Sequence, residues 1–194
     1  IKIRKKLLKE SAMTYVYAKT SGQEIYAEVQ TYVTTTVEKI KSDKKNKKET
    51  AQSAIDYLYH VQEAVKKKIN IFKQYHNVSS GLEVQRKEAE EPMGDLMFNP
   101  YAYEEKRGKE TLYQQTLQRV KELESQASQN KVDLKSSSEL AILEDCLEMS
   151  QEWTKVFTKM MQEKDSFFKR IGRKLGLEEI SSMGGGAVQG HVDN

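Results

Sequence analysis

Proline and glycine occur at only a few places in this 194-residue chain, and their distribution constrains the fold more than any other feature. Both prolines, Pro92 and Pro100, lie in one short segment. Glycine is absent from residue 23 to residue 80 and again from residue 109 to residue 171. Because these two residue types interrupt helices most often, long helices can form on either side of the proline-containing segment.

Apolar residues recur at steps of three and four in four stretches, which predicts four helices. The first covers about residues 23–42. Ser21 is its predicted N-cap, and Glu24, three residues later, has the spacing of a capping box. Its middle is rich in β-branched residues, so a strand is the alternative there. The second covers about 49–74, with His76 near its negative dipole end, and a short turn makes the two an antiparallel hairpin. The third covers about 109–129.

The fourth predicted helix begins at a second capping-box spacing, Ser136 and Glu139, and continues to Leu175. Two adjoining apolar stripes give it a face too broad for a two-stranded seam, so it needs at least two partner helices. At ~1.5 Å per residue this helix would be roughly 60 Å long. We therefore expect part of it to project from the domain and contact another chain.

These elements predict an all-α fold: an elongated helical bundle of about four helices with a long C-terminal helix and an extended tail. The chain divides into a basic N-terminal segment (1–20), a helical hairpin (21–77), an irregular crossover segment (78–105), a second hairpin with the long last helix (106–177) and a glycine-rich tail (178–194). Four of the ten glycines lie in that tail. They would let it order against a surface outside its own domain.

Composition narrows the functional classes. Hydrophobic residues make up 37% and charged residues 31%, which suits helices that bury one stripe. The net charge of +3 is low for a dedicated nucleic-acid binder. Cys146 is the single cysteine, which excludes an internal disulfide and a cysteine-based zinc site. With no secretory signal and no apolar run of ~20 residues for a membrane span, the prediction is a reducing intracellular compartment or a virion.

No catalytic motif stands out. Of the three histidines, His60 has no carboxylate placed to complete a metal site, His76 closes the second helix, and His191 lies in the tail. The glycine run lacks the lysine and following helix of a phosphate-binding loop. Cys146 lies in an apolar stripe without a basic neighbour, as a buried and inert thiol would. We therefore expect a protein that is not an enzyme, with no metal, cofactor or small-molecule substrate.

Protein partners are the predicted ligands, in a homo- or hetero-oligomer. The crossover segment is too apolar for a spacer and would either close the end of the bundle or dock on a partner. The predicted partner-binding residues are Leu96, Met97, Phe98, Tyr101, Tyr103, Trp153, Phe157, Met160, Met161, Phe168, Ile171, Leu175, Met183 and Val188.

A basic amphipathic stretch at residues 164–175 leaves a second function open. Lys169, Arg170, Arg173 and Lys174 lie opposite its apolar face, as in helices that bind membrane surfaces or anions. The alternative is that its phenylalanines form the end of the bundle core. A third alternative is that the basic patches bind nucleic acid, since Lys and Arg could neutralise its phosphates.

The tail "EEISSMGGGAVQG", residues 178–190, resembles the C-terminal ends of small structural proteins of T4-like tailed bacteriophages. The resemblance covers less than a tenth of the chain. Leu177-Glu178-Glu179 also fits the Leu-x-Glu pattern after which the prohead proteases of such phages cleave. The resemblance implies a virion component rather than an enzyme.

Overall fold

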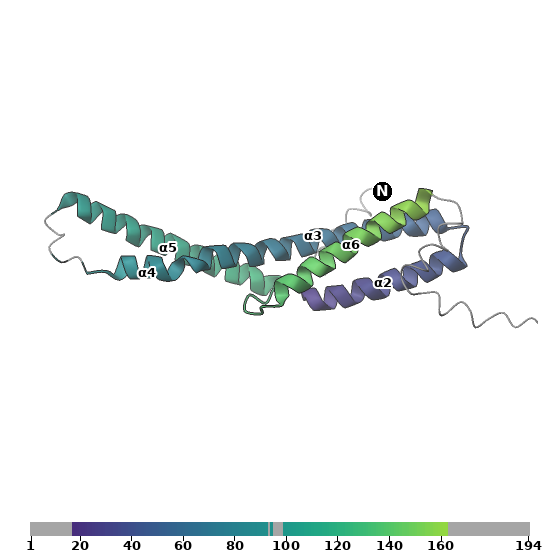
Figure 1. Ribbon diagram of the computed structural model, residues 1–194, viewed down its shortest axis with the longest axis horizontal. Coiled ribbons are helices and arrows are strands. Elements are labelled where there is room, and N and C mark those ends of the chain that lie inside the picture. Colours follow the sequence, from purple (N-terminus) through teal and green to yellow (C-terminus); the bar gives the residue numbers. More distant parts are fainter. Residues whose placement is uncertain (1–16, 93, 95–98, 163–194) are drawn as a thin grey trace, which may run out of the picture.

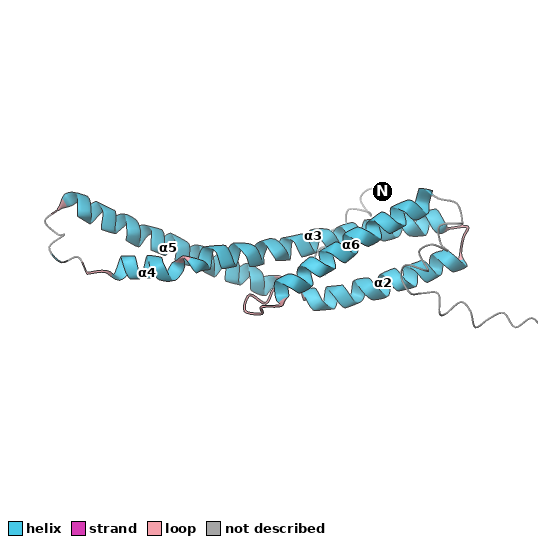
Figure 2. Ribbon diagram, viewed as in Figure 1, coloured by secondary structure: helices cyan, strands magenta, loops and turns pink. Residues whose placement is uncertain are grey.

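The chain folds into an elongated all-α structure, seen here in a computed structural model that describes residues 17–92, 94 and 99–162. The described helices are α2 (Gly22–Ser42), α3 (Lys47–Ser80), α4 (Leu82–Glu90), α5 (Pro100–Gln129) and α6 (Glu139–Gln162). Those same residues contain no strand, which confirms the predicted all-α class (Figure 2).

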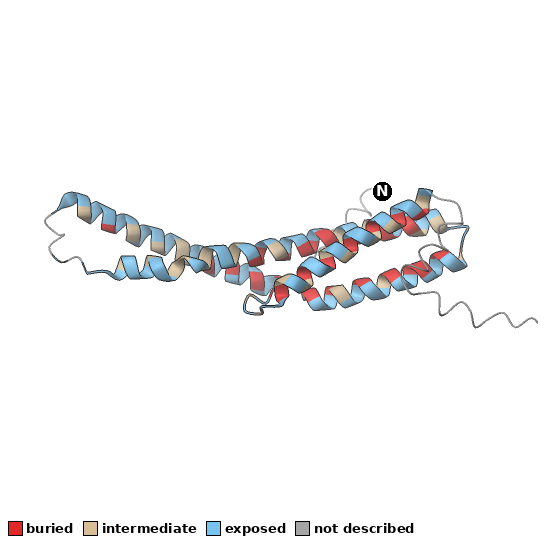
Figure 3. Cartoon of the chain, viewed as in Figure 1, coloured by how far each residue is buried: buried red, intermediate tan, exposed pale blue. Residues whose placement is uncertain are grey.

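One end of the molecule is a three-helix body. There α2 and α3 form the predicted antiparallel hairpin, and α6 packs against both (Figure 1). Its core draws on all three helices, including Ile25 and Val29 from α2, Leu58 and Val61 from α3, and Phe157 from α6. Figure 3 shows the buried residues gathered along the facing sides of these helices. The tight α2–α3 turn is closed by Asp43, whose Oδ2 accepts a 2.8 Å bond from Asn46 Nδ2.

The other end is a two-helix arm, formed by residues 71–80 of α3, by α4 and by α5 (Figure 1). The sequence predicted that part of the last helix projects from the domain. The described part of α6 does not project, so the prediction is wrong for those residues. Its broad face does have two partner helices, as predicted, but both belong to the same chain. The projecting element is the arm. Residues 163–175 of the predicted last helix lie outside the described residues.

In its described residues the crossover segment 78–105 is largely helical, whereas the prediction was an irregular segment. It contains the end of α3, all of α4 and the first turns of α5. Pro100 occupies the first turn of α5, where a missing N–H costs no hydrogen bond, and Asn99 caps that helix by accepting from Tyr101 N at 3.1 Å. Pro92 follows α4. The prolines therefore mark helix ends, and the described residues between α4 and α5 are Glu91, Pro92, Gly94 and Asn99.

The two predicted capping boxes had different outcomes. At α2, Ser21 N donates to Glu24 Oε2 at 2.8 Å and Glu24 N donates to Ser21 Oγ at 3.3 Å, which confirms the first. The second is wrong, because Ser136 Oγ lies 3.0 Å from Ser138 Oγ and Glu139 Oε1 is buried without a hydrogen-bond partner among the described residues. The start of α6 is instead held by burial, since Leu140 packs against Phe72 and its neighbours.

The β-branched middle of α2 is helical, which overturns the strand alternative. The hydroxyls of Thr31 and Thr34 donate to the carbonyls of Ala27 and Gln30, at 3.1 and 2.9 Å, so neither is left without a partner. The second predicted helix ends later than expected, at Ser80. His76 therefore lies inside α3, where its Nε2 is 3.0 Å from the Leu134 carbonyl rather than at a helix end.

Candidate interaction surfaces

The arm is an antiparallel pair of helices with a narrow and increasingly polar seam. Residues facing the seam recur at three- and four-residue steps, as in a coiled coil. Near the body they are apolar, with Val120 and Leu123 of α5 buried. Toward the tip the seam mixes Gln85, Lys106 and Lys109 with Ala102 and Tyr113, which are only partly buried. Gln85 Oε1 is buried with no partner in the described structure. The outer arm therefore has little apolar burial to stabilise it.

A lysine fastens the tip of the arm. Lys106 of α5 is 8% exposed, and its ammonium donates to the carbonyls of Ala89, at 2.9 Å, and of Glu91. These carbonyls are at the C-terminal end of α4, where the last backbone acceptors of a helix lack intrahelical donors and the helix dipole favours a cation. Lys106 thus joins α5 to the end of α4 across the seam.

A second lysine fastens the base of the arm in the same way. Lys68 of α3 is fully buried, and its ammonium donates to the carbonyls of Asn130, which caps the end of α5, and of Ala18, at 3.1 Å. Burial lowers the pKa of Lys68 to about 8, although the nearby carboxylate of Glu139 favours the charged form. Burial also raises the pKa of Glu139. The hydrogen bonds of Lys68 join α3 to the end of α5 and to the segment that precedes α2, where the body meets the arm.

The chain leaves α5 at this junction through a Schellman motif. Lys131 adopts a left-handed φ of 48°, Val132 N donates to Ala127 O at 2.9 Å, and Lys131 N donates to Ser128 O at 3.3 Å. Val132 is buried against Ala127, Ile71 and Phe72 in a small second core. The arm therefore meets the body at a rigid, packed joint.

One face of the arm exposes large apolar side chains. Val84 is 60% exposed, Leu112 is 50% exposed and Tyr101 is 88% exposed. Each immediately precedes a residue that faces the seam, namely Gln85, Tyr113 and Ala102. Successive residues are 100° apart around a helix. In a pair of antiparallel helices, the residues that immediately precede the seam positions of each helix therefore point to the same side of the pair. The three therefore share a face, which we call the Leu112 face.

The register of the arm places Val84 and Leu112 at nearly the same height. Lys106 is level with residues 89–91, which its ammonium contacts. Six residues onward along α5 is Leu112, and six residues back along α4 from Glu90 is Val84. The two aliphatic side chains therefore form the centre of an exposed apolar patch, in which the helical Gly108 leaves open space because a Cβ there would meet nothing within 4 Å.

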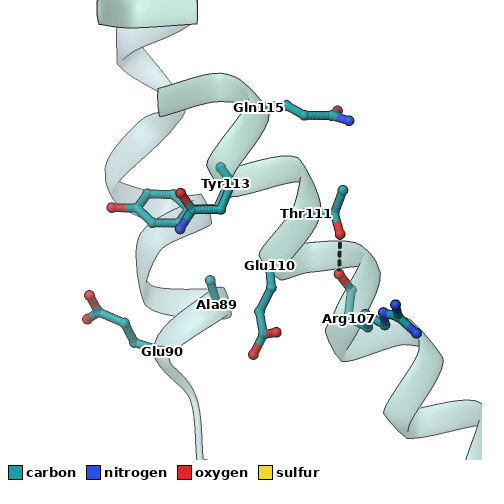
Figure 4. A pocket seen from close by; sticks show the side chains of 8 residues that line it. Ala89, Glu90, Arg107, Glu110, Thr111, Tyr113 and Gln115 are labelled. Carbon is teal, nitrogen blue, oxygen red and sulfur yellow. Dashed lines mark hydrogen bonds between the residues drawn. The ribbon is translucent and has the colours of Figure 1, made fainter. Parts of the chain in front are cut away.

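The opposite edge of the arm carries a shallow polar groove (Figure 4). It is lined by residues that follow the seam positions, including Glu90 of α4 and Glu110 and Gln114 of α5. The side chains of Glu90 and Arg107 extend away from each other, so no set of charges converges on one point. This edge has the mixed, solvated chemistry of an ordinary helix surface, in contrast to the Leu112 face.

A third surface lies between α2 and α6 in the body. Met149 and Trp153 of α6 form one wall of an open groove, and Thr31, Thr34 and Thr35 of α2 belong to the other. Trp153 is half-buried and its ring lies 5.7 Å from that of Phe157. Trp153 and Met161 therefore keep part of the exposure that a partner-binding role needs.

Two of the predicted partner-binding residues do not have that exposure. Phe157 is fully buried and Met160 is 1% exposed, both in the core of the body, because α2 and α3 already cover this stripe of α6. The prediction that they contact another chain was wrong. Of the predicted crossover residues, Tyr101 and Tyr103 are exposed. The other predicted residues lie outside the described residues. They are the partner-binding residues Leu96, Met97, Phe98, Phe168, Ile171, Leu175, Met183 and Val188, and the membrane- or anion-binding residues Lys169, Arg170, Arg173 and Lys174.

The sequence analysis did not identify Val84 and Leu112 of the exposed patch or the buried Lys68. Val84 and Leu112 are isolated apolar residues in polar helices. The feature that could have identified them is that each immediately precedes a residue of the seam. Lys68 had a clearer signal, because it continues the step Val61, Val65, Lys68, Phe72 along the buried side of α3. A lysine at an apolar position indicates that its ammonium has acceptors inside the fold.

Cys146 is buried, and burial raises the pKa of its thiol to about 11. Within residues 17–92, 94 and 99–162, no group of three or more His, Cys, Asp or Glu side chains could hold a metal ion. None of the helices in that part of the chain is long and apolar enough to cross a membrane.

The chain matches no protein-family model, no curated protein and no solved structure. Any functional conclusion therefore depends on the geometry of the body, the arm and their surfaces.

Proposed function

We propose that this chain is a non-catalytic assembly protein that joins a larger homo- or hetero-oligomeric complex through its arm. The observation that carries the proposal is the exposed Val84–Leu112 patch on a projecting two-helix arm. In the outer part of that arm, residues 82–90 and 100–119, no apolar side chain is fully buried. Such an arm buries little apolar surface by itself, and two helices alone are marginally stable in water. Contact with a further helical surface would cover the patch and stabilise the arm.

The shape of the molecule supports a connecting role. The body contains most of the core, while the arm extends away from it and has exposed faces on both edges (Figure 3). An arm of this kind reaches a partner without rearrangement of the body. That the larger complex is a virion is a finer proposal, and its only support is the resemblance of residues 178–190 to phage structural proteins.

Light scattering after size-exclusion chromatography tests the proposal on the full chain. We expect a mass above that of one chain, increasing with concentration, and a loss of the heavier species in L112E. The matched control is Q114E, two residues along α5 on the opposite edge of the arm, which should behave as wild type. A single-chain mass at every concentration, together with the absence of a heavier complex in extracts of the source organism, would refute an assembly role.

A further inference from the structure

We propose that the Leu112 face binds a second copy of the same face, with the two arms antiparallel about a two-fold axis that passes beside Leu112 and Val84. This inference rests on the proposed assembly function and names the partner. It converts two exposed two-helix arms into one antiparallel four-helix bundle, in which each face covers the other.

The apolar centre of the face suits a two-fold contact. Val84 and Leu112 lie at nearly the same height and are each at least half exposed. A two-fold axis at this height stacks Leu112 on its own counterpart and Val84 on its own, so four aliphatic side chains leave water together. Gly108, one turn toward the tip, has no side chain to hold the second helix away.

Charges on either side of this centre specify the antiparallel direction. Glu105 lies seven residues before Leu112 and Arg119 seven residues after it, and both immediately precede seam residues, so both are on the Leu112 face. Each is about 10 Å from Leu112 along the helix axis. The two-fold axis therefore brings Glu105 of one copy to Arg119 of the other, twice. If α5 packed on α5 in the parallel direction, Glu105 would lie beside Glu105 and Arg119 beside Arg119, which is unfavourable. A two-fold axis along the arms would instead place α5 of each copy on α4 of the other, which removes both Glu105–Arg119 pairs.

Both charged residues also have partners in their own chain. Glu105 Oε1 lies 3.1 Å from Lys109 Nζ, Arg119 Nη1 lies 3.3 Å from Glu122 Oε2, and Arg119 Nη2 donates to Gln74 Oε1 at 2.9 Å. These pairs are solvent-exposed, and exposed pairs on a helix are weak. They are therefore weak enough for Glu105 and Arg119 to exchange these partners for each other when a second copy binds.

Disulfide formation tests the geometry directly. The two-fold axis places equivalent residues together, so L112C should form a covalent dimer under mild oxidation at least ten times faster than Q114C on the opposite edge. The native Cys146 is fully buried and adds no background. Equal rates for the two variants, or no dimer from L112C, would overturn the proposal.

Charge exchange tests the direction of the arms. In sedimentation equilibrium, E105R and R119E should each weaken self-association at least three-fold, and the double variant E105R/R119E should restore most of it. Circular dichroism at the same concentrations checks that the variants stay helical. Two single variants with wild-type association, or a double variant weaker than both, would overturn the antiparallel arrangement.

The outcomes separate this inference from the proposed function. If the chain self-associates but L112C and Q114C cross-link equally, assembly uses another surface, and only the second-copy inference fails. If the purified chain stays monomeric while L112E alone loses a heavier complex in extracts, the Leu112 face binds a different protein, which also overturns it. If both the purified chain and the extracts show single chains, the assembly function itself fails.

Discussion

Replacing Lys68 with methionine should change the pH dependence of stability in a direction that can be worked out from its burial. The pKa of Lys68 is about 8 in the folded chain and about 10.4 in an unfolded one. Between these values the unfolded chain binds more protons than the folded chain, so the free energy of unfolding rises with pH. Stability linked to Lys68 is therefore complete above about pH 10.4 and lost as the pH falls through 8.

The magnitude follows from the difference in pKa. About 2.4 pKa units at 1.36 kcal/mol each give roughly 3 kcal/mol. The free energy of unfolding of wild type minus that of K68M should therefore increase by about 3 kcal/mol between pH 7 and pH 10.5. Cys146, Tyr17 and Tyr57, whose pKa values burial raises, also titrate in alkali, but they do so in both proteins and cancel in the difference.

The change with pH in the wild type–K68M difference is more informative than the free energy of unfolding of either protein at neutral pH. There, K68M removes a buried charge but leaves the carbonyls of Ala18 and Asn130 without their donor, and these effects have opposite signs. Urea denaturation followed by circular dichroism at both pH values gives the quantity required. K66M, which replaces an exposed lysine two residues earlier, is the control and should show no such increase. A wild type–K68M difference that is constant or decreases with pH would refute the reasoning.

Three further predictions concern single positions. G22A should cost about 1–3 kcal/mol in urea denaturation, because its Cβ would lie 2.7 Å from Leu143 Cδ2. G108A, with nothing within 4 Å in its own chain, should stabilise the unassociated chain by about 0.5–1 kcal/mol; equal effects would contradict this. K131G should raise stability by about 0.5–1 kcal/mol, because glycine adopts the left-handed φ of that helix end without strain; a lower melting temperature would count against it. Cys146 should react with a thiol reagent at least a hundred times more slowly in the folded chain than in urea, and comparable rates would show that its burial is transient.

The parts of the fold that depend on neighbouring residues were predictable from sequence. Ser21 and Glu24 are three residues apart and form their capping box without help from the rest of the chain. The stripes of α2 and α3 likewise carry their own period, so the hairpin was predictable. The same reasoning failed at Ser136 and Glu139, because Leu134 and Leu140 pack into the small core at the junction and determine where α6 begins.

The features of the candidate surface depend on residues that are far apart in sequence. Lys68 and Asn130 are separated by 62 residues, so the sequence around Lys68 shows an unexpected lysine but not its acceptor. Val84 and Leu112 look like isolated apolar residues until the register set by Lys106 places them side by side. Pro100 misled the prediction for a different reason: at the first turn of a helix, proline is compatible with the helix it was expected to break.

Because α3 is both a wall of the body and the first part of the arm, one continuous helix joins the two. Its 34 residues span about 50 Å as one rod. The direction of the arm is consequently set by the packing of the body. In a two-fold pair joined through the arms, the two bodies would therefore stand at a separation fixed by helix length.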